Sequence, residues 1–314
     1  MTIQPSDRQQ TEGAAPPVDV VVATHHRPEL LRVALDSILE QTYSGLVTVV
    51  VVFDRAEPDL SLARSEGNRR VEVITNTRAP GLAGARNSGI AKGTGQLVAF
   101  CDDDDSWLPD KLARQVEALG SGPALTSVTG ITIVYGGTTS DRVPLQSEMT
   151  LDNLVRSRVM AAHPSTVLVR REALLGPIGL VDEEIPGSYG EDFDWMIRAM
   201  QAGPVVVVEA PLVRVMWGQS LFSSKWQTIV DAIDYGLAKH QVFHEDRRAL
   251  ARLHGRRSFA LAAMGRRREA LTGAARTLWL SPIERRGLLA AAVAMRMVSA
   301  DRLMDLAHRR GHGI

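Results

Sequence analysis

The stretch Leu97–Pro109, LVAFCDDDDSWLP, joins a run of apolar residues to four consecutive aspartates, and it decides how the rest of the chain is interpreted. Such an apolar run predicts a strand buried on both faces, as in parallel sheets. Four adjacent carboxylates repel one another, and a bound divalent cation relieves that repulsion. Carboxylate oxygens suit Mg²⁺ or Mn²⁺. The alternative is a solvated acidic turn before a helix, which the position after a buried strand disfavours.

Segments before this stretch alternate between strand-like and helix-like patterns. Four of them are apolar runs typical of buried strands: Val18–Thr24, Leu46–Phe53, Val71–Thr75 and Gln96–Cys101. Helical patterns fall between them, one opening at Pro28 and two covering about Leu60–Gly67 and Leu82–Lys92. This βαβα order predicts an α/β fold with a mostly parallel sheet flanked by helices. Ligands in such folds bind beyond the carboxyl ends of the strands.

The second half of the chain has a looser pattern. Residues 125–135, 165–170, 205–209 and 212–215 are strand-like, 190–202 is helix-like, and everything from Ser223 onward is helical in pattern. The predicted organisation is a disordered leader at 1–17, an α/β domain at 18–222 and a basic helical region at 223–314. We expect the α/β domain to divide at about residue 120.

Composition narrows the classes of protein that the chain can belong to. Its single cysteine, Cys101, excludes an internal disulfide. The polar start, MTIQPSDRQQTEGAAPP, has no apolar core and is neither a signal peptide nor a membrane anchor. The apolar stretch Leu288–Val298 is interrupted by Arg296 and is too short to span a bilayer. We therefore expect a cytoplasmic location, or a peripheral one at the inner face of the plasma membrane.

Charge is unevenly distributed, although the net charge of the 314 residues is zero. From Arg247 to the C-terminus there are fifteen arginines, no lysine and four acids, which leaves about +11. Basic amphipathic helices can lie on anionic membranes. Equally, such helices can pack on a domain and leave their arginines in water. Nucleic acid is not an expected partner, because no recognised binding module occurs.

The segment around the aspartates resembles glycosyltransferase family 2. GQLVAFCDDDDSWLPDKLARQ, residues 95–115, matches the family's order of apolar strand, Asp-x-Asp, aromatic-Leu-Pro and helix. The resemblance implies a GT-A fold, that is, a Rossmann-like sheet, here with a C-terminal helical extension. It makes residues 18–222 a catalytic domain, with a donor half at about 18–120 and an acceptor half at about 121–222. It also implies that Asp102 and Asp103 lie at the donor and that Asp104 holds Mn²⁺ or Mg²⁺. A run of four aspartates permits a register error of one residue, so the roles of Asp103 and Asp105 stay open.

Three more segments resemble donor-site segments of the family. VVVATHHR matches the first strand and its Thr-x-x-Arg turn, VVVVFD matches the second strand with a base-reading acid, and PGLAGARNSG matches a Gly-x-x-x-Ala-Arg-Asn loop. The matching donor-binding residues are Thr24, Arg27, Asp54, Arg86 and Asn87. Many family members carry a second aspartate after the base-reading acid, whereas this chain has Arg55.

The stretch Gly179–Gly203 contains the candidate catalytic base. Its EDFDWMIR segment resembles the family's Glu-Asp-x-Asp-x-x-x-Arg pattern, which implies that Asp192 is the general base and Glu191 its catalytic neighbour. Acids in a first helical turn also occur simply because they complement the helix dipole. The family's metal-binding histidine is missing, since no histidine lies between residues 205 and 225. The metal shell would then consist of aspartates and phosphate, or use a distant histidine.

The function implied by the resemblance is inverting transfer of a sugar from a nucleotide-diphosphate sugar to an acceptor hydroxyl. The expected acceptor is a saccharide or a lipid-linked sugar of cell-envelope polysaccharide or glycolipid synthesis. Two alternatives are a catalytically idle nucleotide-sugar-binding or membrane scaffold, and a haloacid-dehalogenase-type phosphatase. The phosphatase is disfavoured because that class carries its aspartate motif after the first strand, and here the motif follows the fourth. Donor base, sugar and oligomeric state are not predicted.

Overall fold

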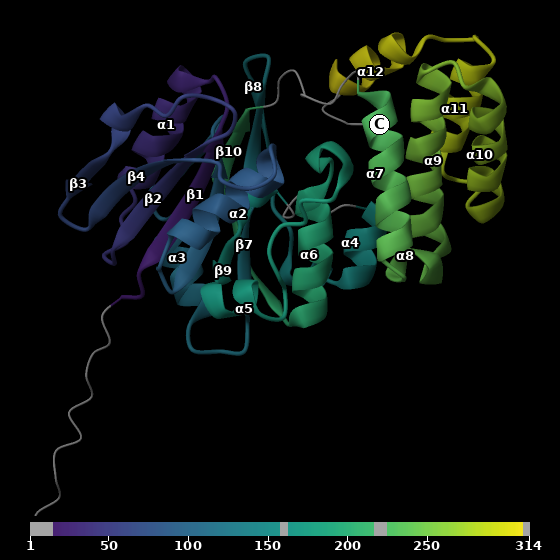
Figure 1. Ribbon diagram of the computed structural model, residues 1–314. Helices are drawn as coiled ribbons and strands as arrows, with labels where there is room; N and C mark the ends of the chain where they lie inside the picture. Colours follow the sequence, from purple (N-terminus) through teal and green to yellow (C-terminus); the bar gives the residue numbers. More distant parts are fainter. Residues whose placement is uncertain (1–14, 158–162, 217–224, 310–314) are drawn as a thin grey trace, which may run out of the picture.

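The computed structural model describes residues 15–157, 163–216 and 225–309 (Figure 1). Most of the predicted leader, and the predicted domain boundary at residue 222, lie outside these residues. Ten strands of the described chain form one sheet in the order β3-β4-β2-β1-β5-β9-β7-β10-β6, with β8 paired to β7. The strands are β1 Val18–Thr24, β2 Val47–Phe53, β3 Arg64–Glu66, β4 Arg69–Thr75, β5 Leu97–Asp102, β6 Asp105–Trp107, β7 Thr126–Tyr135, β8 Thr138–Arg142, β9 Leu168–Arg170 and β10 Val205–Met216.

The predicted mostly parallel sheet is confirmed. Strands β4, β2, β1 and β5 run parallel to one another, and β7 runs parallel to β10. Side chains of β1 alternate between two apolar cores: Val20 and Val22 enter one, and Val21 enters the other. Burial on both faces is the reason why these strands are continuous apolar runs.

Helices cover both faces of the sheet (Figure 1). Those associated with the sheet are α1 Pro28–Leu39, α2 Leu82–Lys92, α3 Lys111–Leu119, α4 Leu151–Ser157, α5 Arg171–Leu175 and α6 Glu191–Ala202. Helix α2 packs against the sheet at Gly89, where the fit is so close that a Cβ would come within 2.4 Å of Val21 Cγ1. Glycine at this position therefore lets the preceding turn of α2, which carries Arg86 and Asn87, lie close to the strand ends.

The C-terminal region is helical, as predicted. It consists of α7 Trp226–Lys239, α8 Val242–Glu245, α9 Arg247–Ala263, α10 Arg267–Leu280, α11 Arg285–Ala294 and α12 Ala300–Arg309. Helices α7 to α9 share one apolar core with α6, to which Ile197, Ile233 and Phe243 contribute. No helix among the described residues has both the length and the apolar character needed to cross a membrane.

Two predicted elements were wrong in detail. Residues 60–67 are not a helix: a short 3₁₀ turn at Leu60–Leu62 is followed by β3, which pairs antiparallel with β4. Gly67, with φ of 55°, makes the tight reversal between them, which a local helical pattern does not reveal. The two short strands expected around Pro211 are a single strand, β10, whose register against β7 shifts at that proline.

Candidate active site

Polar side chains gather where β1, β2 and β5 end. Thr24 is the last residue of β1, Asp54 follows β2 directly and Asp102 ends β5. The three strands are neighbours and parallel, so these residues share one edge of the sheet. The acidic run itself is not a simple loop, because Asp105 already belongs to β6, which pairs with β10.

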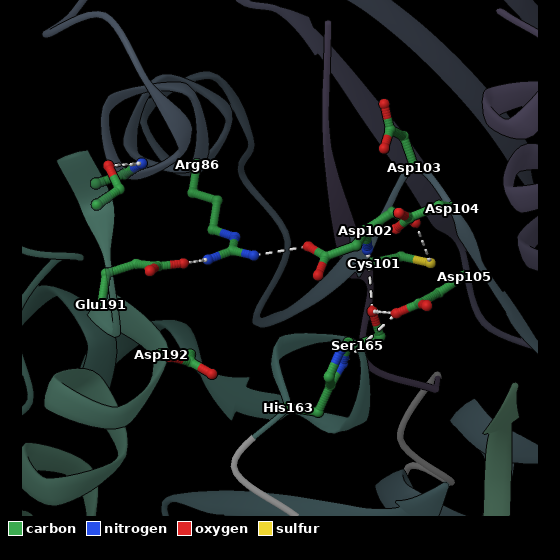
Figure 2. A network of polar contacts seen from close by, with 12 residues as sticks. Arg86, Cys101, Asp102, Asp103, Asp104, Asp105, His163, Ser165, Glu191 and Asp192 are labelled. Atoms are coloured by element: carbon green, nitrogen blue, oxygen red, sulfur yellow. Dashed lines mark hydrogen bonds and ion pairs between the residues drawn. The ribbon is translucent and has the colours of Figure 1, made fainter. Parts of the chain in front are cut away.

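Arg86 connects two parts of the chain that the sequence keeps far apart (Figure 2). Its guanidinium donates to Asp102 Oδ1 at 2.6 Å and to Glu191 Oε1 at 2.5 Å. Burial works against its charge, but the two carboxylates raise the pKa of Arg86 above its usual value. Burial also raises the pKa of Glu191 to about 7, although Arg86 opposes this. The acid that ends β5 and the acid that begins α6 therefore meet across one buried cation.

Asp192 lies beside this bridge. In Figure 2 its carboxylate points toward the space between Arg86 and His163. One oxygen accepts from the amide of Phe193 at 2.8 Å. A small cavity of about 20 Å³ is lined by Arg86, Phe100, Pro164, Val167, Val181, Glu191, Asp192 and Trp195. Both acids predicted to be catalytic thus border the same hollow as the donor-side arginine.

Arg27 forms ion pairs with the middle two of the four aspartates. Its Nη1 atom lies 3.2 Å from Asp103 Oδ1 and 2.7 Å from Asp104 Oδ2. Thr24 Oγ1 donates to the other oxygen of Asp103 at 2.8 Å. Burial raises the pKa of Asp103 and that of Asp104, and Arg27 opposes the rise in both. The predicted metal ligand, Asp104, is therefore ion-paired in this structure.

A different set of side chains has the arrangement of metal ligands. Ligand atoms of Asp102, Asp105 and His163 all lie within 4.8 Å of one another. His163 Nδ1 is 3.5 Å from Asp105 Oδ2, and this buried nitrogen has no hydrogen-bond partner among the residues that the structure describes. Ser165 supports the group, because its hydroxyl donates to Asp105 at 2.5 Å and accepts from the amide of Asp102 at 3.0 Å. Burial raises the pKa of Asp105 to about 7.

His163 and Ser165 were not among the predicted site residues. They precede β9, which runs antiparallel to β5 with Ala99 opposite Leu168. Residues before Leu168 must then lie alongside residues after Ala99, which is where the aspartates are. The one signal in the sequence was indirect: with no histidine between 205 and 225, the histidine next to Pro164 was the nearest candidate upstream.

Asp54 and Asn87 hold the loops around the donor side. Asp54 accepts from Asn76 Nδ2 at 2.8 Å and from the amide of Gly81 at 3.1 Å, so it orders the start of α2. Burial raises its pKa, but these bonds and Arg55 lower it by more. Asn87 donates to the carbonyl of Val181 at 2.8 Å and accepts from the amide of the same residue at 3.0 Å.

The C-terminal helices fix the helix that carries the candidate base. Asp194, two residues after Asp192, lies 2.7 Å from His240 Nε2 and 2.6 Å from Lys239 Nζ. Its other oxygen pairs with Arg198 at 2.9 Å. Burial opposes ionisation, yet these partners hold the pKa of Asp194 well below its usual range. Helix α6 is thus bound to α7 by charge as well as by apolar packing.

Comparison with known proteins bears on the same residues. The family model described as glycosyl transferase family 2 matches residues 19–175, which is half of the chain. The chain belongs to glycosyl transferase family 2. The match contains the strand ends, the Gly-rich loop and all four aspartates, and it gives no support to the phosphatase alternative.

Curated relatives of this family 2 chain are glycosyltransferases and a polysaccharide biosynthesis protein. The succinoglycan biosynthesis protein ExoO of Rhizobium meliloti is 32% identical over 163 residues, covering 51% of this chain and 46% of that protein. The UDP-Glc:alpha-D-GlcNAc-diphosphoundecaprenol beta-1,3-glucosyltransferase WfgD of Escherichia coli is 28% identical over 102 residues, covering 32% and 40%. The chain spans about half the length of the curated relatives it matches.

Solved structures resemble the family 2 chain over most of its length. TarS 1-349 from S. aureus, in complex with UDP-GlcNAc, has a TM-score of 0.60 at 17% identity, covering 94% of this chain and 92% of that one. The mannosyltransferase PcManGT from Pyrobaculum calidifontis, in complex with GDP-Man and Mn²⁺, has a TM-score of 0.56 at 20% identity, covering 92% and 85%. These likenesses show the fold, which is GT-A with a helical C-terminal region.

Proposed function

We propose that this family 2 protein is an inverting, metal-dependent hexosyltransferase that uses a nucleotide-diphosphate sugar. The observation that carries the proposal is the Arg86 bridge. It holds Asp102, at the end of β5, and Glu191, at the start of α6, on one cation. A transferase of this type needs its donor-side acid and its base within one sugar's reach, and unrelated surface acids would have no reason to converge in this way.

Donor binding is assigned to the strand-end residues. Thr24 lies at the end of β1 and Asp54 directly after β2, and a nucleotide would bind beyond these strand ends in a sheet of this topology. Arg27 is a partly exposed cation beside that edge and can transfer from its aspartates to diphosphate oxygens. Solved relatives bind UDP-GlcNAc or GDP-Man, which supports the class of donor and leaves its base and sugar open.

A divalent cation fits the side chains that are present. Asp102 and Asp105 offer oxygen ligands, and Nδ1 of His163, which has no hydrogen-bond partner in the described parts of the chain, offers a third ligand. A mixed oxygen and nitrogen set suits Mn²⁺ better than Mg²⁺, which prefers oxygen alone. We therefore propose that these three residues hold the ion, with Asp104 as the alternative ligand if Arg27 moves onto the donor. When bound, the ion would neutralise charge on the departing diphosphate.

The chemistry assigned to the protein's own residues is a single displacement. Asp192 takes the proton from the acceptor hydroxyl while that oxygen forms a bond to the anomeric carbon. The bond from that carbon to the diphosphate breaks, and its electron pair leaves with the nucleotide diphosphate. Because the two bonds lie on opposite faces, the anomeric configuration inverts. Glu191, held by Arg86, fixes the first turn of α6 and so orients Asp192.

The proposed acceptor is a saccharide or a lipid-linked sugar of the cell envelope. Supporting this, WfgD acts on a diphosphoundecaprenol-linked GlcNAc and ExoO serves succinoglycan synthesis. We place the protein in the cytoplasm or at the inner face of the membrane, where nucleotide sugars are available. The idle scaffold is the competing function, but no observation favours it, because the acids and the Arg86 bridge are all in place.

The test is a panel of UDP-, GDP- and dTDP-sugars incubated with the purified full chain, with and without Mn²⁺. We expect Mn²⁺-dependent turnover of one donor and a loss of about 10²- to 10⁴-fold in Asp192→Asn, with nucleotide binding retained. The matched control is Asp152→Asn, since Asp152 is likewise the second residue of a helix but is exposed on α4. Full activity of Asp192→Asn would remove the base assignment, and turnover of no donor would favour the scaffold.

A further inference from the structure

The turn between α10 and α11 exposes large apolar side chains. Trp279 is 72% exposed, Ile283 is 76% exposed and Leu288 is 58% exposed. They belong to the last turn of α10, the connecting turn and the first turn of α11, where the two helices pack so closely that a Cβ at Gly287 would lie 3.0 Å from Leu278 Cγ. We call these three residues the hairpin patch. Soluble surfaces rarely cluster such side chains without a partner.

Arginines surround the hairpin patch. The guanidinium of Arg247 lies 5.1 Å from the centre of the Trp279 ring and donates to the carbonyl of that residue at 3.1 Å. Arg248 is exposed as the second residue of α9, and Arg285 is exposed as the first residue of α11. Within the described chain, none of these three arginines has a carboxylate within ion-pair distance. The local acid Glu284 is already paired with Arg286 at 2.9 Å.

These arginines are not explained by the stability of their own helices. Cations in a first helical turn oppose the helix dipole, which favours acids there. The exposed surface here therefore combines positive charge with the tryptophan, isoleucine and leucine side chains of the hairpin patch. An anionic lipid bilayer matches this combination, because its headgroups attract arginine while its interface accepts tryptophan and aliphatic side chains.

We propose that the hairpin patch, with Arg247, Arg248 and Arg285, docks the protein on an anionic membrane surface. The helices lie on the bilayer and do not cross it. Figure 1 shows α10 and α11 at the side of the molecule away from the sheet, so docking there leaves the strand ends uncovered. The inference rests on the proposed function only for the idea that a lipid-linked acceptor makes such docking useful; binding itself is testable without any donor.

The experiment is sedimentation of the full chain with vesicles of phosphatidylcholine alone or mixed with phosphatidylglycerol. We expect binding only to the mixed vesicles, and weaker binding at high salt. Trp279→Ala combined with Ile283→Ser should reduce the partition coefficient about tenfold or more. Arg247→Gln and Arg285→Gln should each reduce it about fivefold. The control is Leu60→Ser, which removes a similarly exposed apolar side chain just before β3, the edge strand of the sheet, and should leave vesicle binding unchanged.

Three results would overturn the proposal. One is equal binding of the Trp279 and Ile283 double variant and the unaltered chain. Another is equal binding to neutral and anionic vesicles. The third is a dimer in light scattering, without vesicles, that the double variant converts to monomer, which would assign the patch to a second copy of the chain. If the double variant loses vesicle binding but keeps its donor turnover, the docking proposal is supported. That result does not depend on whether Asp192 is the general base.

Discussion

Replacing Arg86 by methionine removes the cation that joins Asp102 to Glu191. Methionine approximates the length of the arginine stem, so the change deletes charge and hydrogen bonds more than volume. Arg86 is almost fully buried, as is Glu191, and the two donor distances are 2.5 and 2.6 Å. The variant therefore leaves two neighbouring carboxylates without their shared cation in a region with little access to water.

The expected loss of stability follows from that burial. Breaking a buried ion pair by removing one partner typically costs ~3–5 kcal/mol, because the remaining charge is uncompensated. Part of the cost is recovered if Glu191 takes up a proton. Its pKa is already raised to about 7 by burial, and the loss of Arg86 removes the opposing effect. We therefore expect Arg86→Met with Glu191→Gln to be more stable than Arg86→Met alone.

Urea unfolding followed by circular dichroism measures the free energy of unfolding, and donor turnover measures function. The matched control is Arg171→Met, because Arg171 forms a buried ion pair with Asp19 at 2.6 Å on another part of the sheet. Both variants should lose similar stability. Only Arg86→Met should lose turnover by orders of magnitude at temperatures where both remain folded.

Two outcomes would contradict this reasoning. If Arg86→Met unfolds with the free energy of the unaltered chain, the bridge does not contribute as its burial implies. If the double variant recovers stability and also full turnover, the bridge is only structural, and the proximity of Asp102 to Glu191 does not contribute to catalysis.

Three further predictions concern the ion, a buried lysine and helix α6. His163→Ala should weaken Mn²⁺ binding, measured by electron paramagnetic resonance without donor, by about tenfold or more, whereas His26→Ala should not; equal affinities would exclude His163 as a ligand. Burial lowers the pKa of Lys111 to about 7 from 10.5, so its destabilising effect is complete below pH 7 and fades toward pH 10.5. Lys111→Met should therefore raise the free energy of unfolding most at low pH, and a pH-independent gain in urea titrations would refute this. Asp194→Asn should lower stability by ~3 kcal/mol or more and reduce kcat more than it raises KM; unchanged kcat would show that α7 does not position the base.

Local patterns in the sequence were enough to predict the framework. Runs such as Val18–Thr24 are apolar throughout because both faces of the strand are buried, and Leu82–Lys92 was predicted to its ends. The same locality explains the error at residues 60–67, where a glycine turn and pairing with β4 outweigh a helical pattern. The family resemblance, carried by short strings at the strand ends, likewise needed no coordinates.

The sequence alone determined that acids follow the strands, but not which of them act together. That grouping comes from pairing between distant segments. Antiparallel β9 brings His163 and Ser165 beside Asp102 and Asp105, while Arg27 pairs with the two aspartates between them. Asp103 and Asp104 form the turn between β5 and β6 and both face Arg27, whereas Asp102 and Asp105 lie on either side of that turn and face His163. Only the folded sheet brings those partners together, and so only the folded sheet distinguishes one aspartate from the next.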